Sequence, residues 1–334
     1  MPYLPVSLES ILRQPCSDFE IVIIDDGSTD GSWKYLRTVR DRRLHLMSQP
    51  HQGLSATLNR MLSEINTPWL VRHDADDVAY PNRLARTIEF IRRYPETGMF
   101  YSFADYHPHG SVGTFRTTKG TPDDIRKLVL SGYLPAICHP TATLNVEKVM
   151  RVGGYRFNLH VEDIDLWWRM ALDSELRLIP EVTVGVRHNV KSISFTNFAN
   201  QAINTLYVQY LLLSCLWNLT PLPYEEARVA LAQLFDRRKL AFKTHIRTFN
   251  IELGQGDHGN ALRELGRACL ASPIDFWRRL LDEMFGHRGI SVGEPPRNFR
   301  TIQNMLWPLA SRARLNPEAT ASFNLSLPRR ETKV

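Results

Sequence analysis

The chain has 334 residues, with 41 basic and 35 acidic side chains, 43% hydrophobic content and 23% charged content. These values are typical of a globular protein and exclude a disordered, collagen-like or disulfide-rich chain. The length allows two domains of ordinary size. The four cysteines include no pair at C-x-x-C spacing. They therefore indicate neither a zinc site nor a secreted disulfide framework, and a reducing cytoplasm is the expected compartment.

Neither a signal peptide nor a membrane span is expected. The first five residues lack the basic and apolar regions of a secretory signal. The longest apolar stretch, Ile203 to Trp217, is interrupted by polar residues and is too short to cross a bilayer. Residues 201–334 hold 18 basic against 12 acidic residues and so carry the whole net charge of +6. This leaves peripheral contact with the inner face of an anionic membrane open, although a solvated helical surface explains the excess more simply.

Strands and helices alternate over the first part of the chain. The β-branched run 19–24 stops at a cluster of turn formers and predicts a buried strand. Helical spacing of apolar residues over 54–65 leads to a second short strand at 68–71. A helix over 81–94 then leads to a third strand at 98–102. This alternation predicts an α/β fold with a mostly parallel sheet and helices on both faces.

The later part of the chain is predicted to be helical. Apolar residues over 161–172 fall on one face of a helix, and strand signals fade beyond about residue 195. Amphipathic helical patterns follow at 225–235, 261–270 and 276–285. We expect these helices to cover apolar surface of the preceding domain, with the segment around Tyr207 to Trp217 buried. The predicted organisation is an α/β domain over 1–195, a helical region over 196–325 and a flexible tail over 326–334.

The cluster Asp74-Ala75-Asp76-Asp77 is the most informative local motif. It follows the second predicted strand, and residues i and i+2 of an extended segment point to the same side. Asp74 and Asp76 can therefore converge at a strand end, where open α/β sheets bind ligands, and share a divalent cation with substrate phosphates. The alternative is an acidic surface turn, because an isolated D-x-D is short and common.

Three further groups have both a functional and an ordinary interpretation. Asp25 and Asp26 end the first strand, where an Asp can accept hydrogen bonds from a base or ribose, yet a turn before a helix explains them equally. Glu162 and Asp163 supply carboxylates for a general base, but the first turn of a helix favours such residues through capping and the macrodipole. His188 follows a predicted strand as a candidate ligand or a surface residue.

In their joint order these motifs resemble the family 2 glycosyltransferases with the GT-A (Rossmann-like) fold. The similarity covers roughly residues 4 to 195. It is carried by the segments Leu8–Gln14, Asp18–Ser32, Gln52–Ala56 with Asn59, Arg72–Asp77, Pro81–Leu84, His139–Thr141, Val152–Tyr155, Glu162–Trp167 and Arg187–His188.

The resemblance implies roles for the donor-side residues. Asp26, beside Asp25, would contact the nucleotide base, and Arg72 and Asp74 would lie at the donor, with Asp74 on the ribose or in the metal shell. Asp76 would bind the Mn²⁺ or Mg²⁺ on the diphosphate, with Asp77 as the alternative ligand. His188 would complete the metal shell.

The resemblance also implies the reaction. Asp163 would deprotonate the acceptor hydroxyl in a single inverting displacement, and Glu162 would share that role or orient the loop. The expected activity is hexosyltransferase-type transfer from a nucleotide sugar, a UDP-sugar first, to a sugar, lipid-linked or protein acceptor in polysaccharide or glycoconjugate synthesis. A sugar nucleotidyltransferase is a weaker alternative, since it would carry an N-terminal Gly-rich basic loop that this chain lacks.

One departure from the family concerns the start of the chain. The family opens with a strand of the type VSVIIPVYN before the first helix, and this chain starts after it. In the family that strand lies in the middle of the sheet, so we expect exposed strand edges without it. Its absence motivates a non-enzyme alternative, a degenerate GT-A domain that binds a nucleotide sugar or acts as a scaffold. Our expectation is instead that the active protein is longer, with Met1 an internal or misassigned initiator.

Overall fold

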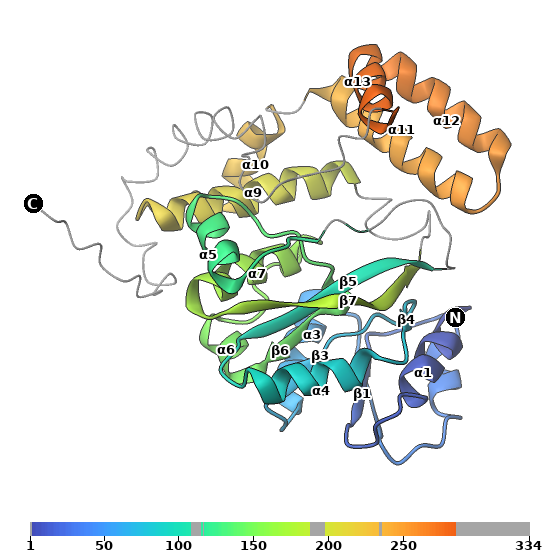
Figure 1. The fold of residues 1–334 in the computed structure, drawn as a ribbon, viewed down its shortest axis with the longest axis vertical. Coiled ribbons are helices and arrows are strands. Elements are labelled where there is room, and N and C mark those ends of the chain that lie inside the picture. The colour runs from blue at the N-terminus through green and yellow to red at the C-terminus, as the bar shows by residue number, and fades with distance from the viewer. Residues whose placement is uncertain (1, 108–114, 116, 188–197, 234–235, 285–334) are drawn as a thin grey trace, which may run out of the picture.

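The computed structural model describes residues 2–107, 115, 117–187, 198–233 and 236–284 (Figure 1). The strands are β1 (Ile21–Asp25), β2 (Leu44–Ser48), β3 (Trp69–Val71), β4 (Val78–Ala79), β5 (Met99–His107), β6 (Thr143–Asn145) and β7 (Leu176–Arg187). The helices are α1 (Leu4–Leu12), α2 (Ser32–Leu36), α3 (Leu54–Glu64), α4 (Arg83–Arg93), α5 (Pro122–Leu130), α6 (Val146–Arg151), α7 (Glu162–Asp173), α9 (Phe198–Leu216), α10 (Tyr224–Ala232), α11 (Arg237–Gly254), α12 (His258–Ala271) and α13 (Pro273–Met284), with a 3-10 turn η1 at His139–Thr141. The predicted alternation of strands and helices is confirmed, and so are helices after it as far as residue 284. The rest of the predicted helical region and the predicted tail over 326–334 lie outside the described residues.

Strand pairing refines the predicted mostly parallel sheet. A two-stranded sheet pairs β1 with β2 in parallel, and a five-stranded sheet has the order β3-β6-β5-β7-β4. In the larger sheet β5 and β7 are parallel, whereas β6 runs antiparallel to β3 and β5, and β4 antiparallel to β7. β3, β5 and β7 therefore share one direction, as the alternation predicts. The reversed strands β4 and β6 have two and three residues, too few to carry a periodic signal.

Helices cover both faces of the larger sheet (Figure 1). α4 lies on one face, α5 and α7 lie on the other, and α9 with α10 packs outside α7. The main core includes the fully buried Trp167 and Trp168 of α7 and continues into α9. Tyr207, Val208 and the segment 210–213 of α9 are buried, which confirms the prediction for this stretch. α11 to α13 pack together around a small core of their own.

The small sheet joins the rest of the domain through α1 and α3. α1 and α2 bury Leu4, Leu8 and Leu36 against β1 and β2. Ser10 of α1 accepts a hydrogen bond from the Ala79 amide of β4 at 2.9 Å. Within the described residues β1 pairs on one side with β2, and β3 pairs on one side with β6, so each presents a strand edge. No helix in the described part of the chain combines the length and apolarity needed to span a bilayer.

Candidate active site

The turn between β3 and β4 contains the predicted acidic cluster. The Arg72 amide donates to the Ala142 carbonyl at 2.9 Å, and the Asp77 amide donates to the Asp74 carbonyl at 3.2 Å, which closes the turn. The Arg72 guanidinium pairs with the Asp74 carboxylate, whose side chain is 32% exposed. Burial alone would raise the pKa of Asp74, but Arg72 and His139 lower it overall. Asp74 is therefore an anion held in place by Arg72.

Asp76 and Asp77 face different surroundings. Asp77 is 3% exposed and accepts a hydrogen bond from the Arg187 amide of β7 at 2.9 Å. Burial and the nearby Asp74 raise the pKa of Asp77 to about 8. The carboxylate of Asp76 makes no hydrogen bond to another described residue, and its pKa is also raised by burial and by Asp74. Asp77 thus anchors β7, while the Asp76 carboxylate has no such anchoring hydrogen bond within the described residues.

A buried polar layer supports the turn from beneath. Arg83 of α4 is 2% exposed and donates to the carbonyls of Arg72 and Pro140. His73 contacts Arg83 through Nδ1 at 3.3 Å and Ser7 through Nε2 at 3.1 Å. Burial and Arg83 lower the pKa of His73 to about 3, so the ring is neutral at physiological pH. These contacts fix the backbone that carries Asp74 and Asp76.

The predicted general-base pair begins α7. Glu162 is 4% exposed, and its Oε2 atom is buried without a hydrogen-bond partner. The Ile164 amide donates to Asp163 Oδ1 at 2.8 Å. Burial, then Glu162 and Asp74, raise the pKa of Asp163 to about 7. A carboxylate with a pKa near the working pH is well matched to proton abstraction.

The two acidic clusters meet around Tyr155. The Tyr155 hydroxyl and His139 Nε2 share a hydrogen bond of 3.0 Å. Burial raises the pKa of Tyr155, and the carboxylates of Asp163, Glu162 and Asp74 add to that rise. Three carboxylates from the β3–β4 turn and from α7 therefore lie within electrostatic reach of one buried hydroxyl. The fold thus brings together residues that are almost ninety positions apart in the sequence.

Asp26 lies at the start of α3. Its carboxylate accepts hydrogen bonds from the amides of Gln52 and Gly53, both at 2.9 Å, and from the Gln49 side chain at 2.7 Å. Burial opposes ionisation, but these hydrogen bonds lower the pKa of Asp26 overall. Asp25 is buried and accepts from the Ser28 amide at 3.2 Å, so it stabilises the loop after β1.

The donor set fits a divalent cation that also binds substrate phosphates. Magnesium is commonly held by one or two carboxylates together with phosphate and water, so Asp76 with Asp74 or Asp77 suffices. In the described part of the chain, no three His, Cys, Asp or Glu side chains gather closely enough to hold a metal alone. His188 lies outside the described residues.

Several supporting residues were not predicted as part of the site. His139, Tyr155 and Arg83 each have an ordinary interpretation when taken alone, and only the fold shows that they face the acidic turn. The sequence segments that contain these three residues did contribute to the family resemblance. That resemblance was the one signal for them in the sequence.

Fold and site together define a class of α/β protein in which an acidic turn between two strands lies near a carboxylate pair at the start of a helix. Residues 1–153 match the model described as glycosyl transferase family 2, so this part of the chain is similar to that family. The match ends before Glu162. The similarity predicted from the motifs is confirmed.

Relatives with known names agree with this assignment. EpsE of Bacillus subtilis (strain 168), named as a glycosyltransferase, is 29% identical over 178 residues, which are 50% of this chain and 61% of EpsE. A UDP-Gal:alpha-D-GlcNAc-diphosphoundecaprenol beta-1,3-galactosyltransferase of Escherichia coli is 26% identical over 62% of this chain and 77% of its own. The crystal structure of S. aureus TarS 1-349 in complex with UDP-GlcNAc superposes with a TM-score of 0.53 at 13% identity, covering 82% of this chain and 79% of TarS. This likeness confirms the GT-A type of fold.

Proposed function

We propose that this protein is an inverting, metal-dependent glycosyltransferase that moves a sugar from a UDP-sugar to an acceptor hydroxyl. The observation that carries the proposal is the convergence of Asp163, with its pKa near 7, and the Arg72–Asp74 pair around Tyr155. A base for the acceptor and an acidic turn for the donor are thereby present in one site.

The proposed reaction is a single displacement. The acceptor oxygen attacks the anomeric carbon as its proton passes to an Asp163 carboxylate oxygen, while the bond from that carbon to the diphosphate oxygen breaks and UDP leaves. Asp76, with Asp74 or Asp77, would hold Mn²⁺ or Mg²⁺, which supplies charge neutralisation on the diphosphate. Arg72 keeps Asp74 ionised and oriented. Asp26, which amides at the start of α3 hold in place, remains the candidate contact for the nucleotide base.

The names of the relatives support the substrate classes. One Escherichia coli relative is named for UDP-Gal and a diphosphoundecaprenol acceptor, and relatives from Erwinia amylovora and Escherichia coli are named for amylovoran and O-antigen biosynthesis. The TarS structure contains UDP-GlcNAc. A UDP-sugar donor and a saccharide or lipid-linked acceptor of polysaccharide synthesis are therefore the first to test. Action on the cytoplasmic side, with peripheral membrane contact through the basic C-terminal region over 201–334, stays a prediction.

The decisive experiment combines a donor screen with binding. UDP-, GDP- and dTDP-sugars are incubated with the full chain and Mn²⁺ or Mg²⁺, and release of the nucleoside diphosphate is measured with and without EDTA. We expect metal-dependent release from a UDP-sugar, and calorimetric binding of UDP that weakens in Asp76→Asn. Absence of UDP binding at millimolar concentration would instead support a scaffold. Pyrophosphate-dependent formation of UTP would support a nucleotidyltransferase.

A further inference from the structure

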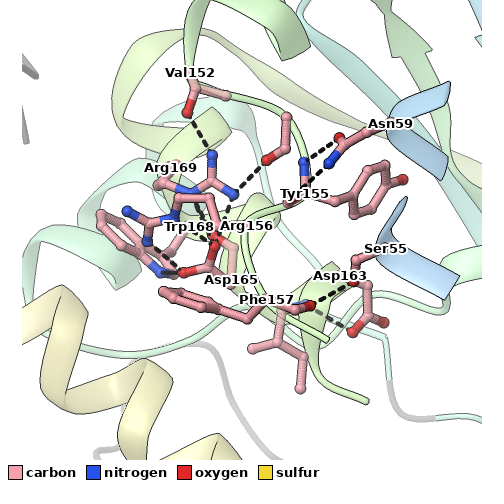
Figure 2. A network of polar contacts seen from close by, with 12 residues as sticks. Ser55, Asn59, Val152, Tyr155, Arg156, Phe157, Asp163, Asp165, Trp168 and Arg169 are labelled. Carbon is pink, nitrogen blue, oxygen red and sulfur yellow. Dashed lines mark hydrogen bonds and ion pairs between the residues drawn. The ribbon is translucent and has the colours of Figure 1, made fainter. Parts of the chain in front are cut away.

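Asp165 is the centre of a buried ion-pair network beside the candidate base (Figure 2). Its side chain is fully buried on α7, two positions after Asp163. Arg156 donates to it through Nε at 2.9 Å and Nη2 at 2.6 Å, and Arg169 donates through Nη2 at 2.7 Å. The Trp168 indole also approaches it at 3.3 Å. One carboxylate thus binds two guanidinium groups away from water.

The same network holds the backbone of the segment 152–158, which precedes α7. Arg169 donates to the Val152 carbonyl at 2.5 Å and to the Gly154 carbonyl at 2.7 Å. Arg156 lies within this segment, and its ion pair with Asp165 links the segment to α7 a second time. A buried ion pair is often no more stabilising than an apolar replacement, so stability alone is a weak reason for this arrangement.

The opposite side of the segment is fixed by α3. Asn59 donates to the Tyr155 carbonyl at 2.7 Å and accepts from the Tyr155 amide at 2.9 Å (Figure 2). Ser55 donates to the Phe157 carbonyl at 2.5 Å. A Cβ atom at Gly53 would lie 2.6 Å from the Asn158 side chain, so the segment is also packed closely against the beginning of α3. That beginning is where the amides bind Asp26.

We propose that Asp165, Arg156 and Asn59 are positioning residues that hold Asp163 and Tyr155 at a fixed place relative to the donor side of the site. The inference rests on the proposed function, because it takes the carboxylate that is held, Asp163, to be the general base. α3 is the physical link: its first amides bind Asp26, and its Ser55 and Asn59 bind the segment that leads to Asp163. Displacement of a reacting group by about 1 Å is enough to lower a rate by about a hundredfold.

The test compares two arginine–aspartate pairs whose aspartates, Asp165 and Asp173, both lie on α7. Arg156→Ala removes one arm of the network, and Arg156→Lys keeps its charge. The control is Asp173→Asn, because Asp173 near the end of α7 accepts from Arg151 at 3.0 and 2.6 Å in a similar bidentate pair. We expect Arg156→Ala to lower kcat about 10- to 100-fold with the donor KM within about threefold, Arg156→Lys to recover part of the loss, and Asp173→Asn to keep kcat within about twofold.

Hydrogen exchange gives a readout that does not depend on turnover. Amides of 154–164 should exchange faster in Arg156→Ala than in the wild type or in Asp173→Asn, while those of 70–77 stay unchanged. If the wild type transfers a sugar from none of the donors, the proposed function fails. The hydrogen-exchange result then tests by itself whether Arg156 holds the segment in place. Equal kcat losses in Arg156→Ala and Asp173→Asn, or unchanged exchange over 154–164 in Arg156→Ala, would overturn the proposal.

Discussion

Replacing Asp163 by Asn should abolish transfer and, at alkaline pH, stabilise the folded protein. The pKa of Asp163 rises from an ordinary 3.8 to about 7, chiefly through burial. The folded state therefore binds this proton more tightly than the unfolded state, so the stability that it contributes is present at low pH and is lost as the pH rises through about 7. At pH 8 the ionised carboxylate is a net cost to folding, and Asn removes it.

The size of the gain follows from the shift. A shift of three pKa units corresponds to about 4 kcal/mol at most. The carboxylate is partly exposed, and an amide oxygen can still accept from the Ile164 amide, so we expect a gain of about 1 to 3 kcal/mol at pH 8. The gain should shrink as the pH falls and approach zero below about pH 3, where both states of the wild type bind the proton.

Asp165→Asn is the matched comparison, two positions later on the same helix. Burial acts against its ionisation, but Arg169 and Arg156 lower the pKa of Asp165 overall. Its charge is therefore stabilising above the ordinary pKa, and that contribution is lost as the pH falls through the lowered value. Loss of the charge removes the counterion of the buried Arg169 guanidinium, and breaking a buried ion pair in this way costs about 3 to 5 kcal/mol. The two substitutions should change stability in opposite directions at pH 8.

Urea unfolding of the three proteins at pH 5 and pH 8 measures both effects. Initial rates between pH 5 and pH 9 test the chemistry: wild-type kcat/KM should rise with pH up to about 7 and then level off, because Asp163 acts as its anion. Asp163→Asn should lose at least about a hundredfold in kcat with UDP binding retained. The reasoning is refuted if Asp163→Asn is less stable than the wild type at pH 8, or if its stability difference does not depend on pH.

Other substitutions separate site residues from structural ones. Asp76→Asn should lower turnover by at least about a hundredfold without loss of melting temperature, because this raised-pKa carboxylate contributes to the site rather than to the core; activity within a few-fold of wild type at saturating metal would contradict it. Asn59→Ala should cost about 1 to 3 kcal/mol in urea unfolding, since it leaves the Tyr155 amide and carbonyl unpaired. Gly53→Ala should lower the melting temperature, because φ is +90° there and an added Cβ atom would clash with the Asn158 side chain. An unchanged melting temperature would mean that the segment 152–158 can move aside at little cost.

The sequence predicted those elements whose side chains repeat with a clear period. The helices over 54–65 and 81–94 and the strand at 98–102 were found because their apolar residues face one core. β4 and β6 were missed because two or three residues contain no period. α11 lies within the predicted helical region but was not predicted as a separate helix, because its apolar side chains are spread around the helix instead of forming one face.

The site was predicted in pieces, and its assembly was not. Asp74 to Asp77 and Glu162 with Asp163 each had a local explanation, as a turn and as the start of a helix. The near-neutral pKa of Asp163 depends first on burial by packed elements, then on Glu162, and to a smaller extent on Asp74, far away along the chain. A property that arises from tertiary proximity has no local sequence signal. Residues such as Asn59 and Arg169 bind backbone carbonyls. Because every residue has a backbone carbonyl, the sequence does not indicate which one such a side chain will bind.

The helix-capping explanation for Glu162 and Asp163 makes two physical predictions, and the structure meets them only in part. A capping carboxylate accepts amide hydrogen bonds of the first turn, and the helix dipole lowers its pKa. Here the N-cap residue is Val161, with no side-chain hydrogen bond, and Asp163 accepts from the Ile164 amide next to it. Glu162 has a buried oxygen without a partner, and the pKa values of both carboxyls are raised. Two adjacent carboxyls with raised pKa values oppose folding when they are ionised, and chemistry explains them better than helix stability does.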